Sequence, residues 1–489
     1  MRRSILHGAP RVNPAQWFLG LAALVLAGAG FLSPSITSAR IITLLTSGIS
    51  LLVAGYAVRN SMRSGLLGQA AMLCAFWVLF YVEAIGCALA APAFALPHGF
   101  PGAGGQFDAE TVHRALLHLC LFQLMLLVGY ASARGLYVLA RRLRFRIDAV
   151  EGFRPLQVFL AAFIVLALGS VYHWDWTSLS RAVLGSYRVR MGQDAYLLSE
   201  PTFLTYLLPV GLYGIAVLFV SALDTRGFER FVAGAFAAAG TIFVLLLSTR
   251  HYLLVILVPV GAAILRRSYR RLTARKLFLW GFAALSALYL FQAQVAVRGS
   301  GWESLGTLSP RQILSADLGS QFQAMLFAES LVPREHDFFK EPTPLQFVTF
   351  WVPRRFWPGK PADDAWTFFD ERLTNGSTTY NVTPTAIGQF YMGFGIVGVG
   401  AIGCFLGMLC RFTDDLIASL RLKVQNAPFV FLATLYVLII NSLRYFAPFY
   451  LWYSVAAFAG MMLLTRRSVR SVVMPSVRLV RAPHSWSGL

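Results

Sequence analysis

The stretch TPLQFVTFWVPRRFWPGKPADDAWTFFDERL, Thr343–Leu373, interrupts a chain that is otherwise a succession of apolar segments. It belongs to a long polar region, residues 293–387, in which charged side chains are interleaved with Trp351, Trp357 and Trp366. A loop of this size between membrane helices is uncommon unless it is functional or disordered. Its aromatic content argues against disorder. We therefore expect the region to contribute to function.

The composition indicates a membrane protein, because 57% of the 489 residues are hydrophobic and only 13% are charged. Apolar runs near the length needed to cross about 30 Å of hydrocarbon recur along the chain. Helices satisfy their own backbone hydrogen bonds inside a bilayer. The sequence thus predicts an all-α polytopic membrane protein with about twelve transmembrane helices and one large periplasmic loop. The predicted spans are 17–32, 42–58, 66–92, 113–139, 155–172, 203–222, 230–247, 251–265, 277–292, 388–410, 427–442 and 448–464.

The distribution of charge predicts the topology. With the N-terminus in the cytoplasm, most of the 42 basic residues fall in cytoplasmic segments, as the positive-inside rule requires, and the outer segments are nearly balanced. Both termini are then cytoplasmic. The net charge of +20 therefore indicates topology and contact with membrane lipids, with no nucleic-acid partner.

Four segments follow from this topology. They are an N-terminal membrane bundle of about nine spans (1–292), a periplasmic loop (293–387), C-terminal spans (388–464) and a basic cytoplasmic tail (465–489). The five cysteines lie in apolar segments without metal-ligand spacing, so the sequence predicts no metal site.

Arginines at the predicted outer surface indicate an anion-binding cavity. Arg250 follows a very short turn, and Arg444 lies between the last two spans, while Arg181 and Arg188 lie in the outer segment 173–202. An arginine at the membrane boundary is costly unless paired or solvated, and guanidinium groups suit phosphate and carboxylate. The alternative is that these arginines reach lipid headgroups or pair with carboxylates of the loop.

Acidic residues and one histidine are the candidate proton acceptors. Asp317 and Glu329 lie in the long loop, and His336 is its only histidine. Glu83 lies within a predicted span, where an acid is either functional or paired with an arginine of another helix. A sugar hydroxyl that attacks an anomeric carbon needs a base to take its proton. A solvated surface position remains the alternative for His336.

Two motifs resemble those of a known family. They read VPRRFWPGKP (352–361) and TPTAIGQFYMGFGIVG (383–398), and they follow Glu329 in the order found in bacterial Wzy-type polysaccharide polymerases. In that family a P-R-x-x-W-P-x-K-P element ends a large periplasmic loop, and a G-E-x-Y-x-N-F-G-x-x-G element opens the next span. Here Gln389 and Gly393 replace the acid and the asparagine of the second element, so no acid role is transferred to position 389.

The resemblance implies a GT-C-like membrane glycosyltransferase of the bacterial inner membrane that needs no cofactor. The donor would be an undecaprenyl-diphosphate-linked glycan chain and the acceptor a lipid-linked repeat unit, with a chain-length regulator protein as a candidate partner. The base would be Glu329 or Asp317. The residues that would hold the diphosphates are Arg181, Arg188, Arg250, Arg354, Arg355, Lys360 and Arg444.

Two other functions remain open. An O-antigen ligase would use the same donor with a lipid A core acceptor, and the presence of His336 in the long loop keeps this alternative open. A transporter or flippase would favour midplane sites, discontinuous helices and internal repeats. We see no repeat in the sequence, and its polar residues concentrate in the predicted outer segments.

Overall fold

The fold is known from a computed structural model, which describes part of the chain. The described residues are 12–64, 66–89, 94, 107–133, 203–223, 226–246, 250–268, 321–340, 357, 364–374, 384–419 and 426–444. The predicted spans at 155–172, 277–292 and 448–464 lie outside them.

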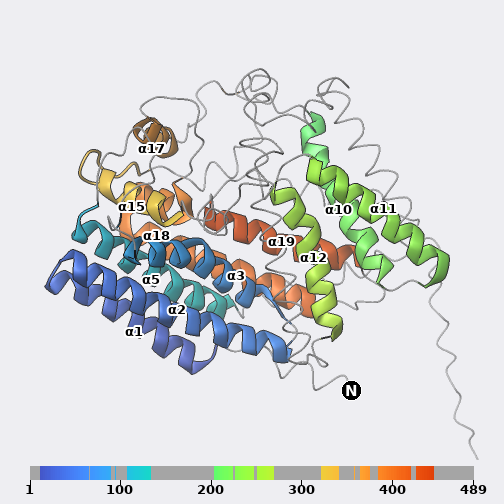
Figure 1. The fold of residues 1–489 in the computed structure, drawn as a ribbon, viewed down its shortest axis with the longest axis horizontal. Helices are drawn as coiled ribbons and strands as arrows, with labels where there is room; N and C mark the ends of the chain where they lie inside the picture. The colour runs from blue at the N-terminus through green and yellow to red at the C-terminus, as the bar shows by residue number, and fades with distance from the viewer. Residues whose placement is uncertain are drawn as a thin grey trace, which may run out of the picture.

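Every regular element in the described ranges is helical (Figure 1). The elements are α1 (Pro14–Ala29), η2 (Gly30–Leu32), α2 (Ile36–Ser64), α3 (Gly68–Phe76), η3 (Trp77–Tyr81), α4 (Val82–Leu89), α5 (Ala109–Ser132), α10 (Phe203–Ala222), α11 (Gly227–Leu246), α12 (Arg250–Ser268), α15 (Gln321–Leu331), α17 (Asp364–Thr374), α18 (Thr385–Ser419) and α19 (Asn426–Arg444). Within these ranges, five segments are long and apolar enough to cross a membrane. They are Pro14–Leu32, Ile36–Ser61, Gly68–Leu89, Ala109–Ser132 and Thr385–Ala418. The described ranges thus confirm a helical architecture with segments long and apolar enough to cross a membrane, whereas the count of twelve spans and the periplasmic loop stay predictions.

The first helix shows the side-chain distribution expected in lipid. Helix α1 buries Gly20, Ala23 and Ala27, and it exposes Phe18 (74%) and Val25 (65%). Small residues at an interface let neighbouring helices approach closely, while large apolar side chains are solvated by lipid tails. This arrangement is the reverse of a water-soluble helix, whose large apolar side chains face the core.

Helices α5 and α18 pack closely through glycines. A Cβ on Gly129 would lie 1.9 Å from the carbonyl oxygen of Cys404, and one on Gly407 would lie 2.1 Å from that of Leu126. Because residues further along α5 contact residues further along α18, the two helices run parallel. The G-x-x-x-G spacing of Gly403 and Gly407 is typical of close helix contacts in membranes.

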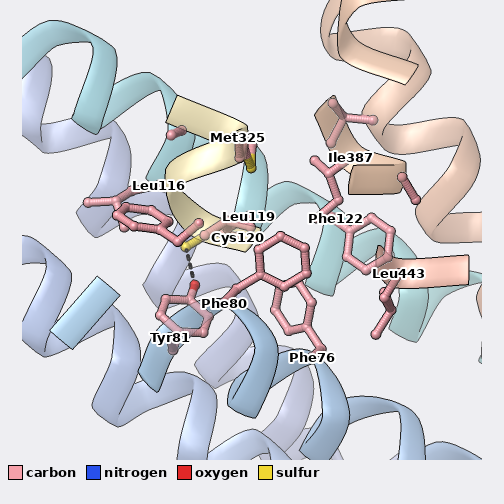
Figure 2. Packing of buried hydrophobic residues seen from close by; sticks show 14 of the residues in the cluster. Phe76, Phe80, Tyr81, Leu116, Leu119, Cys120, Phe122, Met325, Ile387 and Leu443 are labelled. Atoms are coloured by element: carbon pink, nitrogen blue, oxygen red, sulfur yellow. Dashed lines mark hydrogen bonds between the residues drawn. The ribbon is translucent and has the colours of Figure 1, made fainter. Parts of the chain in front are cut away.

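Aromatic side chains fill the core beside this pair. Phe76 of α3 stacks on Phe122 of α5 with ring centroids 5.2 Å apart, and it meets Tyr81 edge-on at 5.8 Å. The π-helical turn η3 lies between α3 and α4. Figure 2 shows these rings next to Met325 of α15 and Ile387 of α18. Residues far apart in the sequence therefore share one core.

The far end of α18 departs from the sequence-based expectation. The sequence predicts a span that ends at residue 410, with Asp414 in the cytoplasmic segment that follows it. Instead the helix continues to Ser419 and Asp414 is completely buried. It accepts hydrogen bonds from the hydroxyls of Tyr130 (2.7 Å) and Tyr436 and from the Gly68 backbone N–H (3.0 Å). A buried carboxylate is tolerated because these donors replace water.

Beside it, Arg411 and Asp415 form a second buried contact that the sequence also placed in a loop. The Arg411 Nε lies 3.1 Å from an Asp415 carboxylate oxygen, one turn away on the same helix. The guanidinium also lies over the Tyr130 ring, 5.4 Å from its centroid. Asp414 and Arg411 thereby join α3, α5, α18 and α19 at this end of the bundle.

The glycine contact predicts a stability effect. Gly407→Ala should lower the free energy of unfolding by roughly 1–3 kcal/mol, because the added methyl group overlaps the α5 backbone. Gly48→Ala on α2 is the matched control, since a Cβ there meets no atom within 4 Å. Thermal unfolding of both purified variants in detergent measures the difference. Equal melting temperatures would contradict the close α5–α18 contact.

Candidate functional site

Helix α15 comes from the polar region, yet it is buried against the apolar helices. All of its residues except Ser330 are buried, and it contacts α4, α5 and α18. Its N-terminus is capped by Glu83 of α4, whose Oε2 accepts a hydrogen bond from the Phe322 backbone N–H at 2.7 Å. A carboxylate at a helix N-terminus satisfies a free backbone donor and complements the helix dipole. One role of Glu83 is therefore to hold α15 in place.

The centre of the site is a buried pair of ionisable side chains. Nδ1 of His118, on α5, forms a hydrogen bond with Oε1 of Glu329, on α15. The side chains are 5% and 0% exposed. We call this pair the His118–Glu329 dyad. The second carboxylate oxygen of Glu329, Oε2, is buried and makes no hydrogen bond with the described residues.

A tyrosine from the second family-like motif completes the site. The ring of Tyr391 lies 4.8 Å from that of His118, measured between centroids, at an interplanar angle of 42°. Its hydroxyl donates to the Val332 carbonyl oxygen at 2.9 Å. The Arg114 guanidinium interacts with this hydroxyl and electrostatically with Glu329. Four side chains from α5, α15 and α18 thus converge.

The site is connected to the surface along one face of α5. Glu110, Arg114 and His118 are spaced four residues apart, so they lie above one another with about 6 Å of rise per step. Glu110 and Arg114 form an ion pair at 2.7 Å. The side-chain exposure falls from 55% at Glu110 to 20% at Arg114 and 5% at His118. Polar groups therefore lead inward from the helix start to the dyad.

A break in α18 positions the segment that carries Tyr391. Gly395 has φ 62° and ψ −149°, a conformation that is essentially restricted to glycine. The carbonyls of Met392 and Gly393 accept hydrogen bonds from the backbone N–H groups of Phe339 (3.0 Å) and Lys340 (2.9 Å). Groups freed by a broken helix must be satisfied in this way inside a membrane. These two hydrogen bonds therefore attach the segment that follows α15 to the broken part of α18.

The start of α5 is held by a charged contact outside the membrane-spanning segments. Asp108 accepts a hydrogen bond from the Thr111 backbone N–H at 2.7 Å, and the Arg334 guanidinium lies 2.8 Å from its carboxylate. Partial burial acts to raise the pKa of Asp108, but the bonds from Thr111 and the Arg334 charge outweigh it and lower the pKa below its usual value. This contact joins α5 to the segment after α15.

Of the two candidate bases, the structure describes only Glu329, and Asp317 lies outside the described residues. The same holds for five predicted diphosphate-binding residues: Arg181, Arg188, Arg354, Arg355 and Lys360. Glu329 is more deeply buried than a loop position suggests. His336 is exposed and stacks on Phe339 with centroids 4.1 Å apart, so it is not part of the dyad.

The other two predicted arginines lie at helix ends. Arg250 is the first residue of α12, and Arg444 is the last residue of α19 and is exposed. The two helices pack against each other. They run antiparallel, since Ile256 shares a cluster with Val437 while α12 residues nearer its C-terminus cluster with the first turns of α19. Both arginines therefore lie at one end of this pair.

That end is also where α18 begins. Leu443, next to Arg444, belongs to the same core cluster as Ile387 near the start of α18 (Figure 2). Tyr436, earlier in α19, bonds Asp414 near the other end of α18. Hence the backbones of Arg250 and Arg444 and the dyad occupy the same end of the bundle.

Sequence analysis missed His118 and gave no role to Tyr391. His118 lies inside an apolar predicted span, and an ionisable residue within a membrane helix is the signal that could have identified it. In the described ranges, His, Cys, Asp and Glu side chains form no group of three or more that could hold a metal ion.

Comparisons with known proteins gave no match. No protein-family model, no curated protein and no solved structure is similar to the chain.

The break in α18 gives a testable expectation. Gly395→Ala should lower the free energy of unfolding by about 1–3 kcal/mol, because an L side chain is strained at this backbone conformation. Gly393→Ala is the control, two residues away, where a Cβ meets no atom within 4 Å. Thermal melting in detergent compares them. If Gly395→Ala is as stable as Gly393→Ala, the break does not have this geometry.

Proposed function

We propose that the protein is a bacterial inner-membrane polysaccharide polymerase of the Wzy type. It transfers an undecaprenyl-diphosphate-linked glycan chain to an incoming lipid-linked repeat unit on the periplasmic face. The observation that carries this proposal is the convergence of Glu329 with Tyr391 around His118. Glu329 and the motif of residues 383–398 carry the resemblance to the polymerases, and they are far apart in the sequence.

The chemistry of the site supports glycosyl transfer. The acceptor hydroxyl must lose a proton as it attacks the anomeric carbon, and a buried carboxylate–imidazole pair can take it. The departing diphosphate must be stabilised by cations held in place before the reaction. Arg114 lies beside the dyad, and Arg250 and Arg444 begin or end helices at the same end of the bundle.

The arrangement of helix ends supports the predicted topology. His113 near the start of α5 bonds the Ser38 hydroxyl at 3.1 Å near the start of α2, and its ring lies against Gly30 at the end of α1. The end of α1 and the starts of α2 and α5 therefore meet, as alternating spans require. Under the positive-inside assignment this is the periplasmic end. Both termini are then cytoplasmic.

One observation favours a second function, the transport of a lipid-linked glycan. Transporter sites use discontinuous helices, and α18 is broken at Gly395. Proton relays in transporters also use Glu and His within spans. The dyad, however, lies about ten residues from the start of α5, a third of the way along the helix, and the polar face leads to one end only.

The deciding experiment is deletion of the gene followed by glycan electrophoresis. Loss of long chains with single repeat units retained supports the polymerase. Loss of all core-attached glycan would support a ligase instead. Accumulation of lipid-linked units on the cytoplasmic face would contradict both and favour a flippase.

Substitutions in the deletion strain test the predicted diphosphate site. Arg250→Ala and Arg444→Ala should each abolish long chains at unchanged protein levels, because they remove a cation from the diphosphate. Arg230→Ala is the matched control, an exposed arginine near the start of α11 at the opposite, cytoplasmic end. Full polymerisation by both single variants would show that these arginines do not bind the diphosphates.

A further inference from the structure

We propose that His118, with Glu329 as its positioning residue, is the base that takes the proton of the acceptor hydroxyl. This inference rests on the proposed glycosyl transfer and deepens it, because the sequence offered Glu329 itself as the base. The dyad geometry, the burial of both groups and the polar face of α5 carry the argument.

The first observation is which atoms of the dyad form hydrogen bonds. Glu329 bonds Nδ1 of His118, so a carboxylate fixes the imidazole with its proton on Nδ1. Nε2 then carries a lone pair, and it forms no hydrogen bond with the described residues. An oriented neutral imidazole is the common form of a general base. The carboxylate also stabilises the imidazolium that forms when Nε2 takes a proton.

The second observation is that Glu329 is poorly placed to act on substrate itself. Its side chain is wholly buried, on a helix that is capped by Glu83 and enclosed by α4, α5 and α18. His118 is also buried, but its side chain is 5% exposed, against 0% for Glu329, and it lies one turn below Arg114 on the polar face of α5. A substrate that follows this face meets the imidazole before the carboxylate.

The third observation concerns the charged and titratable groups around the imidazole. Among the described residues they are Glu329 from α15, Tyr391 from α18 and Arg114 from α5 itself. The Tyr391 hydroxyl donates to the Val332 carbonyl oxygen and also interacts with Glu329. Glu83 of α4 faces the start of α15 at Phe322. Glu329 is thus the group that sets the proton position on His118.

The acceptor oxygen forms a bond to the anomeric carbon of the donor chain, and the bond from that carbon to the phosphate oxygen breaks. The electron pair of that bond leaves with undecaprenyl diphosphate. The hydroxyl proton passes to Nε2 of His118, and the imidazolium releases it to solvent before the next cycle.

The test uses the full-length protein in lipid nanodiscs. Lipid-linked repeat units extracted from the deletion strain serve as substrate, and the rate of chain extension is measured against pH. The wild-type rate should fall toward acidic pH, because an imidazolium has no lone pair to accept a proton. His118→Gln should lower kcat by on the order of 10²- to 10⁴-fold with KM nearly unchanged, and its residual rate should lose the acidic fall.

Glu329 variants separate positioning from structure. Glu329→Gln should lower the rate and alter the acidic fall, since the imidazole loses the carboxylate that orients it. Glu329→Asp should restore part of the rate. His113→Gln is the matched control: it is a buried histidine on the same helix that bonds Ser38 and not α15, and it should keep the wild-type rate and pH profile.

The outcomes distinguish the two proposals. If wild-type protein does not extend the lipid-linked units, the proposed function fails. If wild-type protein extends them and folded His118→Gln keeps the wild-type kcat and pH profile, the dyad proposal fails alone. Rates are normalised to folded protein. Should His118→Gln fold poorly, an unchanged acidic fall in Glu329→Gln overturns the proposal.

Discussion

The pairing of Glu329 with His118 is the interaction on which the position of α15 depends. A carboxylate buried without a partner costs several kcal/mol, and removing one member of a buried pair leaves the other uncompensated. Helix α15 can lie among apolar helices because His118 meets this carboxylate and Glu83 satisfies the helix N-terminus. The next connection follows directly: the chain after α15 bonds the carbonyls that the break in α18 frees. Glu329 and the helix that carries it are thus held by contacts with α4, α5 and α18.

The same contacts explain the glycine pattern of the second motif. Gly388 fits against Ala328 of α15, Gly395 adopts the conformation that breaks the helix, and Gly398 lies against the carbonyl of Phe390. These positions need a missing Cβ for different reasons, namely close approach or an unusual backbone conformation. The motif GQFYMGFGIVG is therefore a constraint on how α18 meets α15, and Tyr391 within it reaches the dyad.

Sequence reasoning predicted the helical class and the long apolar helices of the described ranges, because apolar runs of bilayer length give a strong and local signal. It singled out Glu329 in the long polar region, and Arg250 and Arg444 near predicted membrane boundaries. It could not find the dyad, since that contact joins residues 211 positions apart and depends on the insertion of α15. It also misjudged Asp414, whose charge suggested a loop, because the compensating hydroxyls of Tyr130 and Tyr436 come from other helices. A charged residue in the sequence indicates a free-energy cost of burial, and only the folded structure shows which groups offset that cost.

The central claim is that α15 is inserted against α18, and a disulfide tests it most directly. A Cβ on Gly388 would lie 3.2 Å from the Cβ of Ala328, near the separation of about 3.5–4.5 Å found in disulfides. Ala328→Cys with Gly388→Cys, in a chain whose five cysteines are replaced by alanine, should oxidise readily in membranes, as mass spectrometry of the linked peptides would show. Ala328→Cys with Gly48→Cys on α2 should not. Absence of the 328–388 link under conditions that oxidise accessible thiols would contradict the insertion of α15 and the site built on it.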